Sequence, residues 1–80
     1  MKKITILLID DEPLALKRLA RLLEDYTDTI EIIGSAENGL EAVGMIQKLQ
    51  PEVIFLDIQM PGLNGFEVLQ QLPDPKPKVI

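Results

Sequence analysis

The sequence predicts an α/β domain built on a parallel β-sheet. Short apolar runs of strand length alternate with segments of helical periodicity, in the order β-α-β-α-β-α-β. The runs 4–9 and 53–56 show no polar alternation, which is typical of strands buried on both faces of a parallel sheet. Crossovers between such strands are right-handed. Two of the runs end directly in acidic residues, which makes that end of the sheet the first place to look for a site.

Length and composition narrow the possible functions. A chain of 80 residues forms one small domain, and 46% hydrophobic with 26% charged residues is ordinary for a globular protein. The formal net charge of −5 argues against nucleic-acid binding by this segment. Cysteine and histidine are both absent, so a metal would have oxygen ligands, which favours Mg²⁺. The N-terminal stretch 1–9 faintly resembles the start of a signal peptide, but its apolar run is too short and ends at the acidic residues 10–12. No apolar run approaches the length of a membrane span, so we expect a soluble, cytoplasmic protein without a membrane partner.

The first strand, 4–9, is followed by a predicted helix over 13–25. Pro13 suits a first helical turn, where its missing N–H costs nothing. Apolar residues then recur at i, i+3, i+4 and i+7, as Leu16, Leu19, Ala20 and Leu23.

The second strand is predicted over 30–33, ended by Gly34, after a loop at 26–29. Asn38 is a suitable N-cap, and Glu41 three residues later completes a capping-box pattern for a helix reaching Leu49. Its apolar face is expected to hold residues such as Leu40, Val43 and Ile46. One explanation for Gly44 inside this helix is close packing on the sheet.

The third strand, 53–56, leads through Asp57 to a tight turn at Pro61-Gly62. Asn64 can cap a shorter third helix, and 73–77 must form a loop because of its prolines. Residues 78–80 read as the opening of a fourth strand, so we expect the chain to be part of a longer protein. The apolar residues expected on the third helix are Phe66, Leu69 and Leu72.

The acids at the strand ends are the candidate site. If the first and third strands are adjacent in a doubly wound sheet, Asp10 and Asp11 lie beside Asp57, with Glu12 near the rim. Each acid also has a plain structural reading, as a turn former or as a partner of the helix dipole. Unit charges at ~4 Å repel by about 4 kcal/mol at an effective dielectric near 20, so the group requires a raised pKa or a cation. Asp57 could then attack a phosphoryl group beside Mg²⁺, while the chain shows no obvious cation or hydroxyl for the other phosphoryl oxygens.

In three places the sequence resembles the receiver domain of bacterial two-component response regulators. The match extends over essentially the whole chain, and the three pieces in this order and spacing are highly specific. These pieces are the first strand into Asp10-Asp11-Glu12-Pro13, the stretch Ala36-Glu37-Asn38-Gly39-Leu40-Glu41-Ala42, and Ile54-Phe55-Leu56-Asp57-Ile58-Gln59-Met60-Pro61-Gly62-Leu63-Asn64-Gly65.

The resemblance implies a flavodoxin-like fold with strand order 2-1-3-4-5. It implies that Asp57 is the phosphoacceptor for a sensor histidine kinase or a small phosphodonor, and that the module is a switch without catalytic residues, not an enzyme. Asp11, Asp57 and the backbone carbonyl of Gln59 would bind Mg²⁺, and Asp10 would act mainly through a metal-bound water. The loop beside the site would be Met60, Pro61 and Gly62.

The family also carries a Ser or Thr after its fourth strand and a Lys after its fifth, beyond Ile80. We therefore expect 1–80 to be a partial receiver domain, without the full ability to switch. The stretch 10–15, with 18–24 after it, is similar to regulators whose output is a LytTR-type DNA-binding module. DNA would be contacted only through an output domain outside this chain, and a homodimer is left open.

Three other classes compete with this interpretation. A Mg²⁺-dependent phosphohydrolase would want an acid two residues after Asp57, where Gln59 stands. A nucleotide- or flavin-binding half domain would want a glycine-rich loop in place of 10–13. A structural or interaction fragment would use an exposed sheet face to form oligomers.

Overall fold

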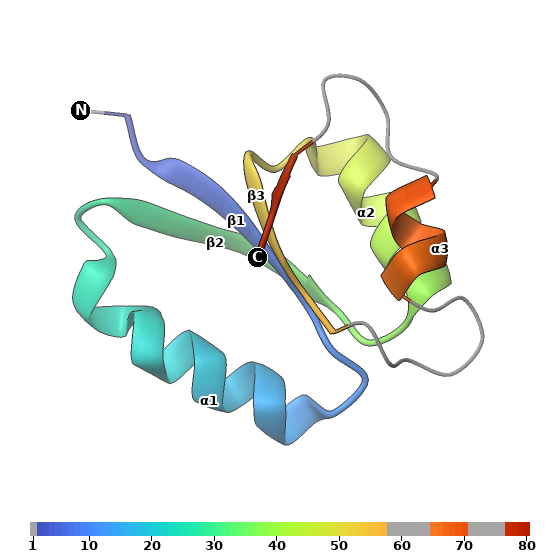
Figure 1. Cartoon of the computed structure of the whole chain (residues 1–80). Helices are drawn as coiled ribbons and strands as arrows, with labels where there is room; N and C mark the ends of the chain where they lie inside the picture. Colours follow the sequence, from blue (N-terminus) through green and yellow to red (C-terminus); the bar gives the residue numbers. More distant parts are fainter. Residues whose placement is uncertain (1, 58–64, 71–76) are drawn as a thin grey trace.

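The alternation of strands and helices is confirmed by a computed structural model, which describes residues 2–57, 65–70 and 77–80 (Figure 1). The elements follow the predicted order, with one short 3₁₀ helix, η1, added after the first helix. They are β1 (Ile4–Ile9), α1 (Pro13–Leu23), η1 (Glu24–Tyr26), β2 (Ile30–Ala36), α2 (Gly39–Leu49), β3 (Val53–Leu56), α3 (Gly65–Gln70) and β4 (Lys78–Val79).

The four strands form one parallel sheet in the order β2-β1-β3-β4. This order confirms the flavodoxin-like prediction as far as the chain extends. In the pairing of β1 with β3, Ile6 lies opposite Val53 and Ile9 opposite Leu56. The residues that follow these strands, Asp10 and Asp57, therefore leave the sheet at the same level.

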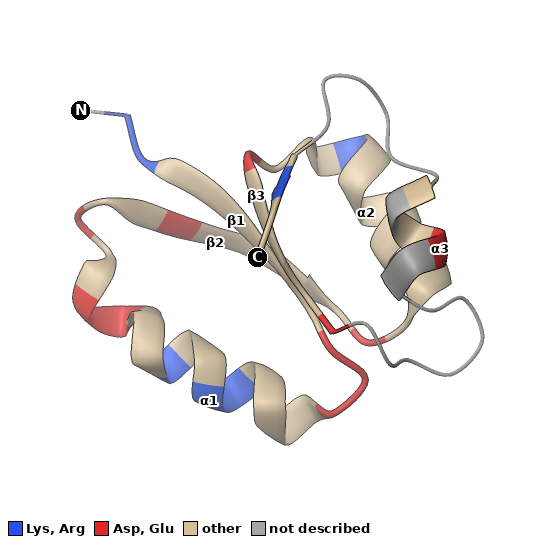
Figure 2. Cartoon of the chain, viewed as in Figure 1, with Lys and Arg blue, Asp and Glu red and all other residues tan. Residues whose placement is uncertain are grey.

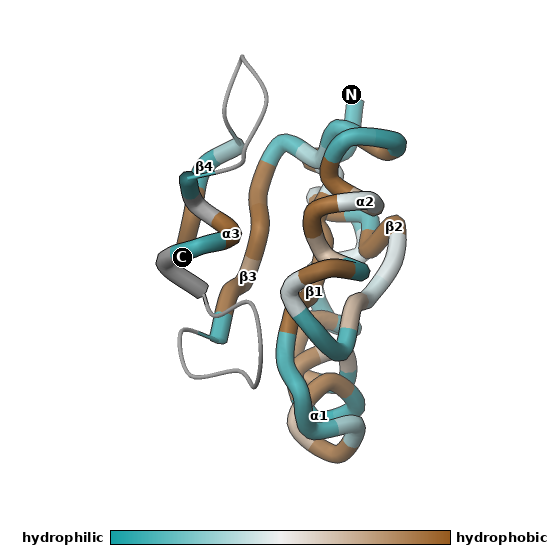
Figure 3. The backbone as a smooth tube through the Cα atoms, turned by 90° about the vertical axis from the view of Figure 1, so that its right-hand side faces the viewer, coloured by the Kyte–Doolittle hydropathy of each residue, from teal (hydrophilic) through white to brown (hydrophobic). Residues whose placement is uncertain are grey.

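Helices cover the two faces of the sheet unequally (Figure 1). On one face α2 and α3 pack over a core with seven buried members: Leu7, Ile9, Ala36, Ala42, Ile46, Ile54 and Val68. On the other face α1 packs over a smaller core: Ile6, Leu8 and Leu16. Figure 3 shows the hydrophobic colouring running along β3, as expected for a strand with apolar residues toward both layers.

The prediction that Gly34 ends the second strand is wrong. β2 continues to Ala36, with a register shift that leaves one extra residue between the partners of Ile6 and Leu7. A Cβ atom at position 34 would lie 2.7 Å from Cε of Met45 on α2 and 3.4 Å from Cδ1 of Leu7. The glycine is therefore where a helix packs closely on the strand, not where the strand stops.

Three predictions about the helices need correction. The first helix ends at Leu23 and tightens into η1, so it is shorter than 13–25. Leu40 is 79% exposed and takes no part in the core. A Cβ atom added at Gly44 would meet no neighbouring side chain or strand of the described residues within 4 Å, so close packing does not explain this glycine. Gly34 is the glycine at which helix and sheet meet.

The predicted N-cap of α2 agrees with the structure, whereas one core residue of α3 was missed. Oδ1 of Asn38 accepts a hydrogen bond from the backbone N–H of Glu41 at 2.8 Å, which confirms the N-cap. α3 contributes Val68, a fully buried residue that was not among the apolar residues predicted for this helix. The predicted cap Asn64 and the apolar Leu72 lie outside the described residues. Among the residues that the structure describes, no helix has the length and apolar character needed to cross a membrane.

Candidate functional site

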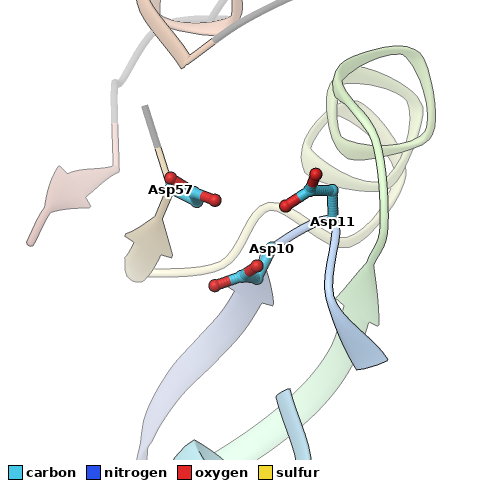
Figure 4. A group of neighbouring side chains, drawn as sticks. All are labelled: Asp10, Asp11 and Asp57. Atoms are coloured by element: carbon cyan, nitrogen blue, oxygen red, sulfur yellow. The ribbon is translucent and has the colours of Figure 1, made fainter. Parts of the chain in front are cut away.

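Three carboxylates gather where β1 and β3 end (Figure 4). Asp10 and Asp11 follow β1 and Asp57 follows β3, and one oxygen of each lies within 4.8 Å of the other two. All three residues are half-buried. The predicted meeting of these acids at the carboxyl edge of the sheet is therefore what the structure shows.

Backbone hydrogen bonds from neighbouring strands hold two of these residues in place. The N–H of Asp57 donates to the carbonyl of Ile9 at 3.0 Å, and the N–H of Asp10 donates to the carbonyl of Ala36 at 3.1 Å. Oδ1 of Asp10 also accepts from the N–H of Glu12 at 3.0 Å, which closes the turn that carries Asp11. The sheet thus sets the spacing of the acids, and the turn adds the third.

Ala36, whose carbonyl anchors Asp10, was not among the predicted site residues, because the second strand was expected to stop before Gly34. The parallel register of β1 and β2 could have predicted this role of Ala36. β2 must extend to the level of Ile9 if one of its carbonyls is to accept a hydrogen bond from the N–H of Asp10. Glu12 is exposed at the rim, as expected. The predicted carbonyl ligand Gln59 and the site loop Met60, Pro61 and Gly62 lie outside the described residues.

Asp11 shows the electrostatic consequence of this crowding. Partial removal from water raises the pKa of its carboxyl group, and the negative charges of Asp57 and Asp10 raise it further. A hydrogen bond with its own backbone works in the opposite direction without cancelling the rise. A cation among the three groups would offset the repulsion from Asp57 and Asp10.

The donor set fits a hard divalent cation. Carboxylate oxygens are the ligands that Mg²⁺ prefers, and it commonly takes one or two of them while keeping several waters. The opening beside the group is lined by Asp10 and Asp57 together with apolar neighbours: Ile9, Leu19, Phe55, Leu56 and Ile80. A ligand bound at Asp57 would thus approach along a partly apolar wall.

The family model described as the response regulator receiver domain matches residues 6–80. The chain belongs to this family.

Curated relatives agree with the assignment. The receiver chain is 46% identical over 78 residues to the transcriptional regulatory protein BtsR of Salmonella typhi, covering 96% of this chain and 32% of the relative. It is also 46% identical over 78 residues to a response regulatory protein of Vibrio cholerae. The chain therefore spans about a third of the length of the curated relatives it matches.

Solved structures agree as well. The response regulator domain of Thermotoga maritima CheB superposes with a TM-score of 0.82 at 34% identity, covering 98% of this chain and 58% of that one. The signal receiver domain of NarL from Mycobacterium tuberculosis gives a TM-score of 0.79 at 30% identity, covering 86% and 55%. Receiver domains bind Mg²⁺ at acidic residues and are phosphorylated by histidine kinases, and they are generally not enzymes.

Proposed function

We propose that residues 1–80 are part of a receiver domain in which Asp57 accepts a phosphoryl group from a sensor histidine kinase. The observation that carries the proposal is the group of three carboxylates within 4.8 Å of one another at the ends of two adjacent parallel strands. Asp10, Asp11 and Asp57, with the backbone carbonyl of Gln59, would hold Mg²⁺. The proposal includes a cytoplasmic location and an output domain elsewhere in a longer chain.

Bound Mg²⁺ would supply positive charge against the phosphoryl oxygens and the crowded carboxylates. A carboxylate oxygen of Asp57 attacks phosphorus in line with the leaving group. One O–P bond forms, the N–P bond of a phosphohistidine breaks, and the leaving imidazole nitrogen keeps the electron pair and takes a proton. The hydrogen bond from the N–H of Asp57 to the Ile9 carbonyl holds the backbone of the nucleophile during this exchange.

The first test is the effect of Mg²⁺ on thermal stability. A ligand that binds only the folded state at a hundredfold excess over its Kd stabilises by about 2.7 kcal/mol, so the melting temperature should keep rising as the Mg²⁺ concentration is increased. Asp11→Asn and Asp57→Asn should remove most of the rise. Glu12→Gln is the matched control, because Glu12 is an exposed acid of the same turn outside the group of three.

The second test is covalent labelling. Incubation with acetyl phosphate and Mg²⁺ should add one phosphoryl group at Asp57, detected by mass spectrometry, and EDTA or Asp57→Asn should prevent it. We expect a version extended through the family's Ser or Thr and Lys to label to a higher level. Labelling that survives Asp57→Asn would contradict the assignment of the phosphoacceptor, and equal labelling of the two lengths would contradict the role given to the missing groups.

A further inference from the structure

The outward face of α1 and η1 carries basic residues along α1 and acidic residues along η1. α1 carries Lys17, Arg18 and Arg21 and no acidic residue, whereas η1 begins with Glu24 and Asp25. Figure 2 shows this as blue bands along α1 followed by red at its C-terminal end. The face is therefore basic over one part of its length and acidic over the next.

Large apolar side chains also stand on this face. Leu14 is 65% exposed and Leu22 is 70% exposed. The core side of α1 is formed by different residues: Leu16, Leu19, Ala20 and Leu23. Leu14, Arg18, Arg21 and Asp25 recur at spacings of four and three, so they form one stripe on the solvent side of the helix.

Within the described residues, these charges have no ion-pair partner in the chain: Lys17, Arg18, Arg21, Glu24 and Asp25. Opposite charges sit side by side along the stripe without cancelling each other. A uniformly acidic partner would suit the basic half and be repelled by Glu24 and Asp25. A second copy of the chain, turned end to end, carries the complementary order of both signs.

We infer that the α1–η1 face is a self-complementary contact between two copies of this chain, packed antiparallel about a twofold axis beside Leu22. In an antiparallel pair about this point, Leu22 meets Leu22 of the second copy. Arg18 then lies within one residue of the level of Asp25 of the second copy, and Arg21 within one residue of the level of Glu24. The twofold axis repeats each attraction, because in an isologous contact residue i meets j and j meets i.

The expected association is weak and sensitive to salt. A single short helical face buries less than the about 800 Å² per partner of a standard interface. Exposed ion pairs are also screened as ionic strength rises. The contact is independent of the phosphoacceptor proposal, since Mg²⁺ binding and labelling at Asp57 involve the carboxyl edge and the dimer involves the outer side of α1.

A charge swap in the 80-residue chain tests the contact, read by sedimentation equilibrium at low salt over a range of concentrations. Arg18→Glu and Asp25→Arg should each weaken dimerisation about tenfold, because each turns two attractions into repulsions. The double variant should recover most of the wild-type affinity. Lys48→Glu on α2 is the matched control, with the same change of charge at an exposed position outside the stripe, and it should dimerise like wild type.

Circular dichroism spectra and melting curves will show whether each variant folds. A wild-type chain that is monomeric at every concentration would overturn the contact. So would a folded double variant that stays as weak as the single variants, because the pairing of position 18 with position 25 would then be wrong. Leu22→Ser keeps every charge of the stripe and should still weaken the dimer. A Leu22→Ser dimer as strong as wild type would place the twofold axis elsewhere and overturn the proposed packing.

Discussion

The acidic residues at the two ends of the parallel strands differ in their interactions: an acid at the amino ends is hydrogen-bonded, whereas the acids at the carboxyl ends are crowded together. At the amino edge, the carboxylate of Glu52 accepts from the N–H of Thr5 at 3.3 Å, while the N–H of Glu52 donates to Oγ1 of Thr5 at 3.0 Å. At the carboxyl edge, Asp10, Asp11 and Asp57 lie together, and the charges of Asp57 and Asp10 help to raise the pKa of Asp11. One edge ties β1 to β3 by hydrogen bonds, and the other brings like charges close together.

Under the proposed function, this difference marks the place where the fold gives up stability for activity. Crowded like charges are unfavourable in the absence of a partner, and a stabilising substitution at such a site commonly costs activity. The amino edge carries no such conflict, because its polar groups are mutually hydrogen-bonded. The stability change caused by a substitution at the carboxyl edge should therefore depend on Mg²⁺. The change caused by a substitution at the amino edge or in the core should be the same with and without Mg²⁺.

The largest effect is expected in the core, where Ile54 is fully buried on β3. Ile54→Ala should lower the free energy of unfolding by about 2–5 kcal/mol, because it removes buried methyl groups and leaves a cavity. The increase in the free energy of unfolding caused by Mg²⁺ should persist in the folded variant. Urea unfolding with and without Mg²⁺ measures both quantities, with Ile80→Ala, 67% exposed, as the near-neutral control. Loss of the Mg²⁺ response in a folded Ile54→Ala variant would show that core and edge are not separable.

The next effect belongs to the amino edge. Thr5→Val keeps the shape of the side chain but removes the hydroxyl that accepts from the N–H of Glu52 at 3.0 Å. The N–H keeps its bond to the backbone carbonyl of Thr5 at 3.1 Å, so stability should fall by only about 0.5–1 kcal/mol. Thr5→Ser retains the hydroxyl and should lose less. The loss should be equal with and without Mg²⁺ in urea titrations, and a loss that appears only with Mg²⁺ would break the distinction between the two edges.

The approach to the amino edge contains one strained residue. Gln50, the C-cap of α2, has φ 48° and is followed by Pro51. Non-glycine residues pay roughly 1–2 kcal/mol in this conformation, whereas glycine adopts it freely, so Gln50→Gly should gain about 0.5–1 kcal/mol after its greater freedom in the unfolded chain is counted. Gln47→Gly, the same change inside α2, should lose about as much. Melting curves of the two variants measure these changes in stability. If both variants were less stable than wild type, the inferred strain at Gln50 would be refuted.

The strand order was predicted from the family resemblance, and the meeting of the acids followed once the first and third strands were taken as neighbours. Apolar runs without alternation identified β1 and β3, and parallel pairing placed Asp10 beside Asp57. The extent of β2 was missed because Gly34 has the local character of a strand breaker, while its actual role depends on Met45 from a distant helix. Leu40 was misplaced because helical spacing alone does not show which side of a helix meets the sheet.

The smallest effect expected is a pH dependence at the carboxyl edge. The pKa of Asp11 is raised in the folded state, so the folded chain binds this proton more tightly than the unfolded chain. The stabilising contribution of the protonated group is complete below the ordinary pKa of 3.8 and is lost as pH rises through the raised value. In EDTA at neutral pH, Asp11→Asn should therefore be more stable than wild type, and the gap should close as the solution is acidified toward pH 3.8. With Mg²⁺ at neutral pH the order of stability should reverse, because only wild type keeps the full set of ligands.

Gly44→Ala is the control for this prediction, because it changes no titratable group. It should gain up to about 1 kcal/mol, equally at both pH values and in both solutions. If Asp11→Asn behaved like Gly44→Ala across these conditions, the crowding of charge at this edge would have no measurable consequence.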